Sequence, residues 1–343
     1  MRQRSKPRKI TIVFALVILA AAAFAMSGAF PNTASAPFIS SGAGHAREED
    51  PAATDAASAQ PGASASADSS VSPEVTPGVK TGAPDNDFLI VRMSVSDISA
   101  GDLVLINRDF IYPIPDEDVF TRIAELKTPS YRLADGRMLL AEHVIGPLND
   151  MMDAFLEETG NDTVAVVSAF RNFDEQLDAL SEYVTHMGYS EAVRWAAPPG
   201  YSEHHAGLAV DLGVYRSGSF RTFRDVGDNA WFLKNSYRFG FIARYPENKT
   251  IITDTAAEPW HFRYAGDPHA FIMYENDWCL EEYVQLLMDY SYDDPLSITY
   301  NEVEYRIYFT SDIDVPIPFD CDFDISGNNV NGFIVTLKLD PIP

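Results

Sequence analysis

The chain has 343 residues and a formal net charge of −25, with 25 lysines and arginines against 50 aspartates and glutamates. Such an excess of negative charge repels phosphate backbones, so the composition argues against nucleic acid as a partner and fits an acidic, well-solvated exterior. Two cysteines, Cys279 and Cys321, are too few for a disulfide framework. A bridge between them is left open, and it would tie the C-terminal end of the chain to the domain before it.

Residues 1–30 are expected to form a membrane anchor or signal segment. Met1 to Lys9 carries five basic residues, and Ile10 to Phe30 is an uncharged apolar run long enough to cross a bilayer, with its basic flank in the cytoplasm. Ala34-Ser35-Ala36 resembles a cleavage site, but Pro37 follows it directly, so the sequence favours a retained anchor and leaves a cleaved signal peptide open. In both cases the rest of the chain is expected to be extracytoplasmic.

Residues 31–85 are expected to form a disordered tether, because Ala, Ser, Pro, Gly and Thr dominate them. They offer too little apolar surface to offset the entropy that is lost when a chain becomes ordered. A folded domain is expected over residues 86–290, with a first short strand at Leu103 to Asn107.

Helical spacing of apolar side chains predicts a helix over residues 139–158. A valine-rich strand is expected over residues 163–170, and Asn172 with Glu175 has the pattern of a capping box that starts the next helix. Arg171 is therefore expected at a junction between strand and helix, where a rigid scaffold can aim a cation into a cleft. A structural salt bridge is the alternative for this arginine.

A histidine and a carboxylate lie seven positions apart in the stretch from Tyr201 to Gly213. We expect His204 in a loop and Leu208 to Leu212 in a strand, with Gly207 as the break between them. Residues at an odd separation in one regular strand point to opposite faces. The break at Gly207 therefore lets His204 and Asp211 reach one point.

A third candidate ligand lies in the stretch from Glu258 to Tyr264, where alternating aromatic residues predict a strand with His261 on its opposite face. The side chains of His204, Asp211 and His261 offer nitrogen and oxygen ligands suited to Zn2+, and three protein ligands leave a fourth position open for water. Glu258, three positions before His261, is placed to take a proton from that water.

From Ile298 onward the apolar period changes to two, and Asn331-Gly332 introduces a last strand, so residues 291–343 are predicted to form a small β-rich extension. Three aspartates would line one side of an extended segment there, but the glycine and glutamate of a helix-loop-helix calcium site are missing. Across the chain, short helices and strands without a repeating strand-helix-strand pattern predict an α+β fold.

The motifs SEHHAGLAVDLG and EPWHFRY resemble the signatures of the zinc D-alanyl-D-alanine carboxypeptidases of the VanY type. Further pieces of the pattern occur in the family's order: LVLIN at 103–107, SAFR at 168–171 with Gln176, GFIARYP at 240–246 and CLEEY at 279–283. The resemblance covers about residues 88–290. It implies a central antiparallel sheet flanked by helices, with the zinc ion in a cleft.

The resemblance also implies roles for individual residues. The metal ligands would be His204, Asp211 and His261, with Glu258 as the general base and Arg171 stabilising the oxyanion or gripping the substrate. The substrate contacts would be Ser168, Gln176 and Ser202. His205 departs from the polar residue expected at its position, and we interpret it as a loop side chain near the rim, with a role in supporting the metal ligands as the alternative.

The implied activity is a zinc-dependent D,D-carboxypeptidase that releases the terminal D-alanine from peptidoglycan stem peptides. An L,D-carboxypeptidase that trims the tetrapeptide stem and a non-catalytic cell-wall-binding domain of the same fold are the alternatives. The motifs do not separate the two peptidase specificities, nor do they exclude an endopeptidase that cuts cross-links. We expect a monomer that is tethered to the membrane and uses peptidoglycan stem peptide as its substrate.

Overall fold

A computed structural model of the chain describes residues 74–77, 88–319 and 321–339. The expected membrane segment and most of the expected tether lie outside these residues, as does Asp320. Across the ranges described, the structure contains no helix with the length and apolar character needed to span a membrane. Four residues of the expected tether form strand β1 (Glu74–Pro77), which pairs with β2 (Phe88–Arg92). Backbone hydrogen bonds to an open strand edge can order such a short segment without an apolar core.

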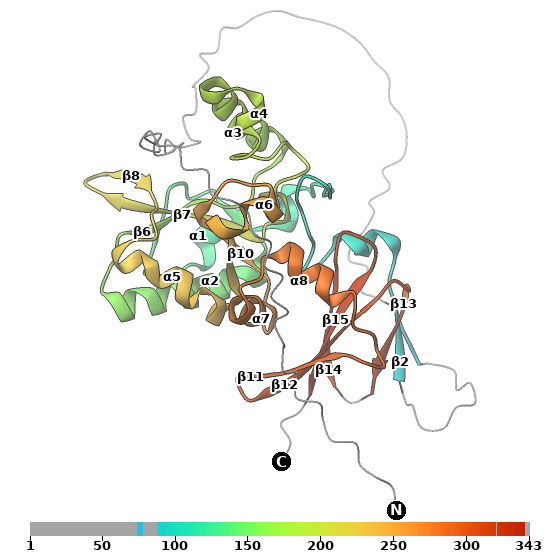
Figure 1. Ribbon diagram of the computed structural model, residues 1–343. Helices are drawn as coiled ribbons and strands as arrows, with labels where there is room; N and C mark the ends of the chain where they lie inside the picture. Colours follow the sequence, from blue (N-terminus) through green and yellow to red (C-terminus); the bar gives the residue numbers. More distant parts are fainter. Residues whose placement is uncertain (1–73, 78–87, 320, 340–343) are drawn as a thin grey trace, which may run out of the picture. The chain divides into compact units, whose positions relative to one another are not determined.

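The central sheet has the strand order β4-β6-β7-β10-β9, with β8 paired to β7 (Figure 1). Its strands are β4 (Arg132–Leu133), β6 (Val164–Ser168), β7 (Ala209–Arg216), β8 (Ser219–Thr222), β9 (Phe241–Tyr245) and β10 (Glu258–Tyr264). All neighbouring pairs are antiparallel except β4 with β6. The predicted α+β class, with an antiparallel central sheet, is therefore confirmed.

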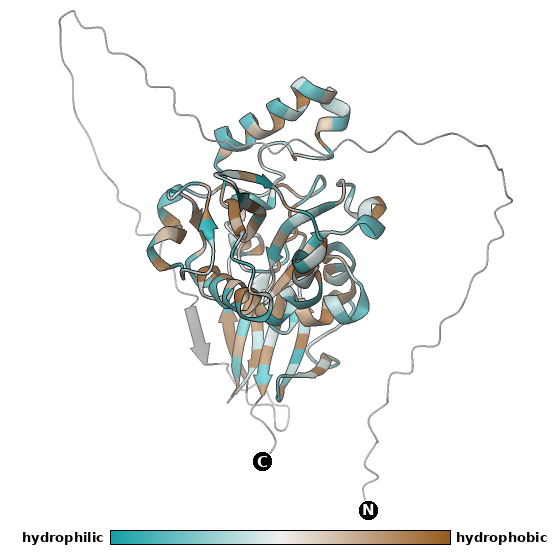
Figure 2. Ribbon diagram, turned by 90° about the vertical axis from the view of Figure 1, so that its left-hand side faces the viewer, coloured by the Kyte–Doolittle hydropathy of each residue, from teal (hydrophilic) through white to brown (hydrophobic). Residues whose placement is uncertain are grey.

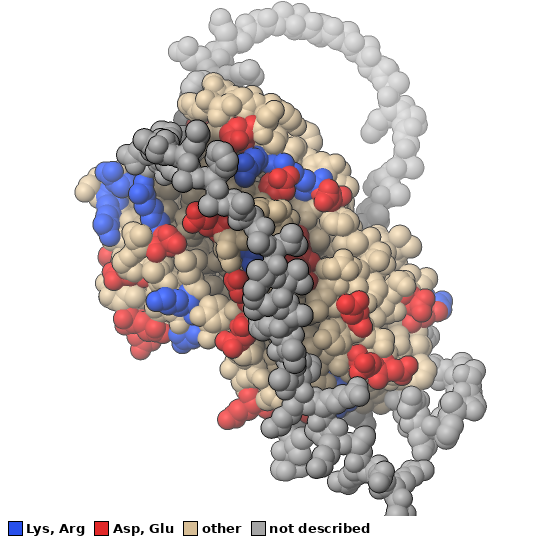
Figure 3. All heavy atoms as spheres, in the orientation of Figure 1, with Lys and Arg blue, Asp and Glu red and all other residues tan. Residues whose placement is uncertain are grey.

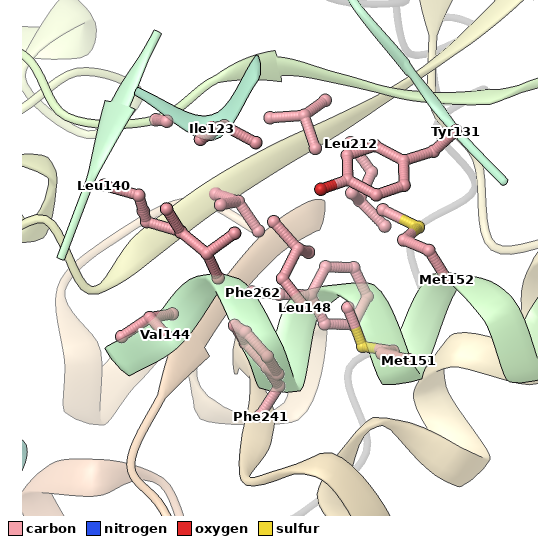
Figure 4. Close-up of a cluster of buried hydrophobic side chains, with 14 of the residues drawn as sticks. Ile123, Tyr131, Leu140, Val144, Leu148, Met151, Met152, Leu212, Phe241 and Phe262 are labelled. Atoms are coloured by element: carbon pink, nitrogen blue, oxygen red, sulfur yellow. The ribbon is translucent and has the colours of Figure 1, made fainter. Parts of the chain in front are cut away.

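Helix α2 (Glu142–Thr159) covers one face of this sheet. Figure 4 shows Val144 and Leu148 of the helix directed toward Leu212 of β7 and Phe262 of β10, all in one buried cluster. Burying a side chain such as Leu148 contributes roughly 1.5–3 kcal/mol. Because side chains alternate along a strand, the residues next to Leu212 and Phe262 point away from this core, to the opposite face of the sheet.

Helix α3 (Phe173–Met187) begins at the capping box that the sequence predicts. The Asn172 side chain accepts a hydrogen bond from the Glu175 backbone N–H at 2.9 Å, and the Asn172 N–H donates to Glu175 Oε2 at 3.0 Å. Helix α4 (Tyr189–Ala192) packs against α3 around a small apolar cluster of its own (Figure 1). The position of Arg171, between β6 and α3, follows from this cap.

The remaining elements of the domain are short. They are β3 (Thr121–Arg122), β5 (Leu139–Leu140), α1 (Ile123–Leu126), α5 (Ala230–Asn235), α6 (Thr250–Thr253), α7 (His269–Asn276), α8 (Leu280–Leu287) and the 3-10 helices η1 (Val95–Ser99), η2 (Glu117–Val119), η3 (Glu203–Ala206), η4 (Gly227–Asn229), η5 (Ser236–Phe239) and η6 (Glu247–Lys249).

A second antiparallel sheet, in the order β11-β12-β15-β14, follows α8. Its strands are β11 (Leu296–Tyr300), β12 (Val303–Thr310), β14 (Asp322–Gly327) and β15 (Phe333–Leu339), and β13 (Asp314–Pro318) pairs instead with β2. One face packs on α7 and α8, and the other packs on β2 and β13. Apolar residues accordingly recur along these strands in Figure 2. Both ends of the folded region, β2 and β15, therefore contribute to one apolar core.

Residues 103–107 do not form the predicted strand. They are deeply buried, but their backbone groups find partners outside any ladder: Leu103 N–H donates to Ser326 Oγ, and Leu105 O accepts from Asn329 Nδ2. The apolar run LVLI was a correct sign of burial. It could not show that Ser326 at the end of β14 and Asn329 in the following turn supply the hydrogen bonds.

The two cysteines do not form the bridge that the sequence left open. Neither Cys279 nor Cys321 forms a disulfide bond. Cys279 lies at the N-cap of α8, where its backbone N–H donates to Glu282 Oε2 at 2.9 Å. The C-terminal sheet is instead attached to the rest of the fold by packing and by hydrogen bonds.

One of these attachments is a buried histidine between α7, α8 and β15. His269 Nδ1 lies 2.7 Å from the Tyr283 hydroxyl, and Nε2 lies 2.9 Å from Thr336 Oγ1. Burial lowers the pKa of His269 from 6.5 to about 3, and the Asp102 carboxylate opposes this shift. The folded protein therefore keeps this imidazole neutral.

His269 is expected to make stability depend on pH. Between pH 6.5 and 3 the unfolded chain binds a proton at this position that the folded chain does not bind, so the free energy of unfolding falls as the pH is lowered through this window. His269→Gln keeps polar atoms but cannot titrate, and it should flatten that slope in urea unfolding at a series of pH values. The control is His186→Gln, on the exposed side of α3. An identical slope in His269→Gln and the parent protein would contradict the prediction.

Candidate metal centre

Three side chains that the sequence singled out meet on the face of the central sheet opposite α2. Asp211 of β7 and His261 of β10 are direct partners in the antiparallel register, which sets their side chains next to each other. Gly207, with a φ of 64°, turns the chain from η3 into β7 and brings His204 to the same point. A Cβ at this position would lie 2.4 Å from the Phe120 ring, so glycine is required. The ligand atoms of the three residues lie within 4.8 Å of one another.

His204 offers a free lone pair at this point. Its Nδ1 lies 2.5 Å from the Ala169 carbonyl oxygen, which can only accept, so Nδ1 donates and Nε2 carries the lone pair. Nε2 is buried without a hydrogen-bond partner and lies 3.3 Å from Asp211 Oδ2. Burial, aided by the charge of Arg171, lowers the pKa of His204 to about 4. A neutral imidazole with an unused buried nitrogen beside a carboxylate fits a metal ligand.

His261 lies between two carboxylates. Its Nδ1 is 3.0 Å from Asp211 Oδ1, and its Nε2 is 3.4 Å from Glu203 Oε2. Burial alone would lower the pKa of His261, but the hydrogen bonds to Asp211 and Glu203 raise it to about 9. The site therefore attracts positive charge, which a proton or a divalent cation can supply. With Nε2–H donating to Glu203, Nδ1 is the atom left for a metal ion.

Glu203, which the sequence analysis did not single out, lies near the site and is bound by two buried arginines. Its Oε1 accepts from Arg244 Nε at 2.8 Å and from Arg263 Nη1 at 2.9 Å, and all three side chains are fully buried. Burial would raise the pKa of Glu203, but the two guanidinium groups hold it well below its usual range. The signal in the sequence was the presence of arginines inside the apolar strands β9 and β10, since buried cations require an anion.

Glu258 reaches the metal side of β10 through an irregularity in the strand. The register of β10 with β9 shifts between Glu258 and Phe262, so that Glu258 Oε2 lies 3.7 Å from His261 Nδ1 although the two residues are three positions apart. Burial raises the pKa of Glu258 to about 8; His261 opposes this shift and Asp211 adds to it. A carboxyl group with such a pKa can accept and return a proton near neutral pH.

A cavity of about 80 Å³ lies beside these residues. Arg171 and Ser202, both expected at the substrate, line it. An aromatic wall completes it, in which the rings of Tyr183 and Trp195 and then of Trp195 and Trp260 are stacked with centroids 6.5 Å apart. The sequence did not single out Tyr183, on α3, or Trp195, in the turn after α4, since aromatic side chains more often indicate packing.

Two expected substrate contacts are placed elsewhere. Gln176 is fully buried on α3, where its Nε2 donates to the Ala197 carbonyl at 2.7 Å, and it does not line this cavity. Ser168 lines a neighbouring cavity of about 300 Å³, which shares Arg171 with the first. The inward face of an amphipathic helix explains the burial of Gln176.

His205 is not at the rim, where the sequence suggested it. It is fully buried, with Nε2 accepting from the Gly200 N–H at 3.0 Å and Nδ1 donating to the Arg171 carbonyl at 2.6 Å. The 3-10 helix turns this side chain inward. His205 therefore positions the backbone of Arg171 against the loop that leads into η3.

The chain is similar to known proteins over the residues that carry this site. Residues 137–267 match the model of the family VanY, D-alanyl-D-alanine carboxypeptidase. The chain is 33% identical over 245 residues to a D-alanyl-D-alanine carboxypeptidase of Enterococcus faecium, covering 69% of this chain and 75% of that protein. It is 34% identical over 214 residues to a D-alanyl-D-alanine carboxypeptidase of Enterococcus faecalis, covering 59% and 72%. The predicted family resemblance is confirmed.

A solved structure is similar over most of the fold. It is the vancomycin resistance D,D-dipeptidase VanXYg in complex with a D-Ala-D-Ala phosphinate analog. The TM-score is 0.64 at 29% identity, and the match covers 73% of this chain and 98% of that chain. The similarity therefore extends beyond the two sequence motifs to the arrangement of the sheet and helices.

Glu203→Gln is expected to weaken divalent-metal binding, because the amide no longer holds His261 with a full negative charge. Loss of such a partner of a metal-binding histidine typically costs about 10- to 100-fold in affinity. Zinc competition against a chromophoric chelator measures the effect. The matched control is Glu281→Gln, since Glu281 accepts from Arg244 at 2.6 Å. That change should lower stability in urea and leave zinc affinity unaltered. Equal affinity in Glu203→Gln and the parent protein would rule out this role.

Proposed function

Because the chain belongs to the VanY family of D-alanyl-D-alanine carboxypeptidases, we propose that it is a zinc-dependent D,D-carboxypeptidase that releases the terminal D-alanine of peptidoglycan stem peptides. The observation that carries this proposal is the convergence of His204, Asp211 and His261 beside Glu258, at a cavity lined by Arg171. The similar VanXYg structure, which holds an analog of D-Ala-D-Ala, supports the choice of substrate.

Zinc fits the donor atoms that these residues present. The ion would be held by His204 Nε2, an Asp211 oxygen and His261 Nδ1. Because His204 Nε2 is buried without a hydrogen-bond partner, a metal site is favoured over a purely structural cluster. Nitrogen and carboxylate ligands of this number are typical of catalytic zinc. When bound, zinc supplies Lewis acidity, which acidifies a water molecule and polarises the scissile carbonyl.

Glu258 is proposed as the general base and then the general acid. Its carboxylate takes a proton from the attacking water and returns it to the nitrogen of the departing D-alanine, so the bond between carbonyl carbon and nitrogen breaks as an amine leaves. Burial raises the pKa of Glu258, which makes its carboxylate a stronger base than an exposed one. Its distance of 3.7 Å from His261 Nδ1 places it beside the metal ligands.

Arg171 is proposed to stabilise negative charge on the former carbonyl oxygen. Its side chain lines the cavity, and its Nε is buried without a partner. The backbone is fixed on both sides, since the carbonyl accepts from His205 and the N–H donates to the His204 carbonyl at 3.4 Å. Loss of a donor in this role typically costs about 100-fold or more in rate.

We propose that the enzyme acts as a monomer outside the cytoplasm, tethered by its N-terminal segment. The support for the tether is the basic start and the apolar run of residues 1–30, which is long enough to cross a bilayer. Asp and Glu side chains are spread over the face shown in Figure 3, which fits an acidic, solvated exterior.

Release of D-alanine from synthetic stem peptides tests the proposal. Pentapeptide ending in D-Ala-D-Ala should release D-alanine, chelator should abolish the release and added zinc should restore it. Release from the tetrapeptide alone would show an L,D-carboxypeptidase instead. Bound zinc without release from either peptide would show a wall-binding domain, and release that resists a chelator would refute the zinc mechanism.

Glu258→Gln should retain zinc and lose turnover, because the amide cannot accept the proton of the attacking water. Removing a general base typically lowers kcat about 100- to 10,000-fold. Zinc content and D-alanine release measured on the same preparation separate the two effects. Glu247→Gln makes the same chemical change at an exposed position and serves as control. Near-normal turnover in Glu258→Gln would remove this residue from the role.

A further inference from the structure

The cavity beside the metal ligands contains a second arginine, Arg108, that no sequence motif indicated. Arg108 lies in the irregular segment after residues 103–107, whereas Arg171 lies between β6 and α3. In both guanidinium groups one buried nitrogen has no hydrogen-bond partner: Nε of Arg171 and Nη2 of Arg108. Buried donors in proteins are nearly always paired, so each unpaired nitrogen marks a place for an acceptor that the polypeptide does not itself provide.

The position of Arg108 is fixed on the side away from the cavity. Its Nη1 donates to Asp254 Oδ2 at 2.6 Å. The turn that carries it is closed by Asn107, whose Oδ1 accepts from the backbone N–H groups of Asp109 and Phe110 at 3.0 and 3.2 Å. Asn107 is in turn held by Glu281 at 3.2 Å. The guanidinium of Arg108 is therefore fixed through Nη1 by Asp254, and its Nη2 is available to a ligand.

The two arginines suit two different negative charges. Arg171 lines the cavity together with His204 and Glu258, and the proposed function assigns it to the reacting carbonyl. In a peptide that is cut before its last residue, the terminal carboxylate is only one residue away, about 3.8 Å from one Cα to the next. A cavity of about 80 Å³ accommodates such a small terminal residue. Arg108, in the same cavity, is then the cation available to the carboxylate.

We propose that Arg108 binds the terminal carboxylate of the substrate and thereby restricts the enzyme to peptides with a free carboxyl end. The inference rests on the proposed function and addresses what the motifs left open, the choice between a carboxypeptidase and an endopeptidase. The Asp211 carboxylate would repel an anionic peptide end, and Arg108 offers an opposing positive charge in the same cavity. A guanidinium suits this task because its fork of donors matches a carboxylate.

The test compares two substrates that differ only at the carboxyl end: the stem pentapeptide as free acid and as C-terminal amide. Arg108→Met, which keeps the apolar stem, should lower kcat/KM for the acid about 10- to 100-fold, the range for a hydrogen bond to a charged group. The rate for the amide should change by no more than about twofold. Arg108→Lys should rescue part of the loss through its charge, and Arg108→Gln should behave as the Met variant does.

Arg238→Met is the matched control, because Arg238 is half exposed and pairs with Glu158 at 3.0 Å outside this cavity. It should leave the preference for the acid over the amide intact. Melting temperature and zinc content verify that each variant is folded and loaded. In the pair with Arg108, Asp254 is 64% exposed, and such a partly exposed ion pair contributes little stability, so the substitutions are expected to fold.

An equal loss on acid and amide in Arg108→Met, or an unchanged preference for the acid, overturns the role of Arg108 while the proposed function stands. Failure of the parent protein to release D-alanine from the acid overturns the proposed function, and the role of Arg108 falls with it. Parent protein that cuts the amide as fast as the acid also overturns the proposal, because carboxylate recognition would then contribute nothing.

Discussion

The buried carboxylate of Glu203, held between Arg244 and Arg263, is the interaction on which the site depends. Charges are costly to bury, and breaking such a pair by removing one partner typically costs about 3–5 kcal/mol because the other charge is left uncompensated. Replacement of any one of these three residues by a neutral side chain is therefore expected to destabilise the fold. The second carboxylate oxygen, Oε2, faces His261 Nε2 and orients that ring. The buried ion pairs of the core therefore also determine the geometry of the metal centre.

The same arginines connect the site to distant parts of the chain. Arg263 donates to the carbonyls of Asp102 and Val104, and Arg244 bonds Glu281 at the start of α8. Residues 103–107 are in turn anchored by Ser326 at the end of β14 and by Asn329 in the turn after it. The C-terminal sheet, which could be taken for an appendage, thus supports the segment that carries Arg108 and braces β10. Strands β2 and β13 pair in the same region, although 222 positions separate the register partners Arg92 and Asp314.

Charge also organises the chemistry proposed for the cavity. Three carboxylates around His261 create a negative centre that a divalent cation would neutralise, and two arginines at its edge face the charges that a peptide substrate brings. An acidic protein with a net charge of −25 would otherwise repel a substrate that ends in a carboxylate. The family relationship fixes the class of reaction. The roles proposed for Arg171 and Arg108 would explain why the reaction takes place at the last peptide bond.

The sequence by itself determined the α+β class, the cap at Asn172, the break at Gly207 and the three residues that converge, because each leaves a local trace in spacing or residue type. Only the tertiary structure decided the burial of Gln176 and His205, the irregular path of residues 103–107, the position of Glu203 and the unpaired nitrogen of Arg108. These features depend on contacts between segments far apart in the chain, whose partners no local pattern reveals. A side chain's role as ligand, support or packing follows from what surrounds it, and that is settled only when the chain has folded.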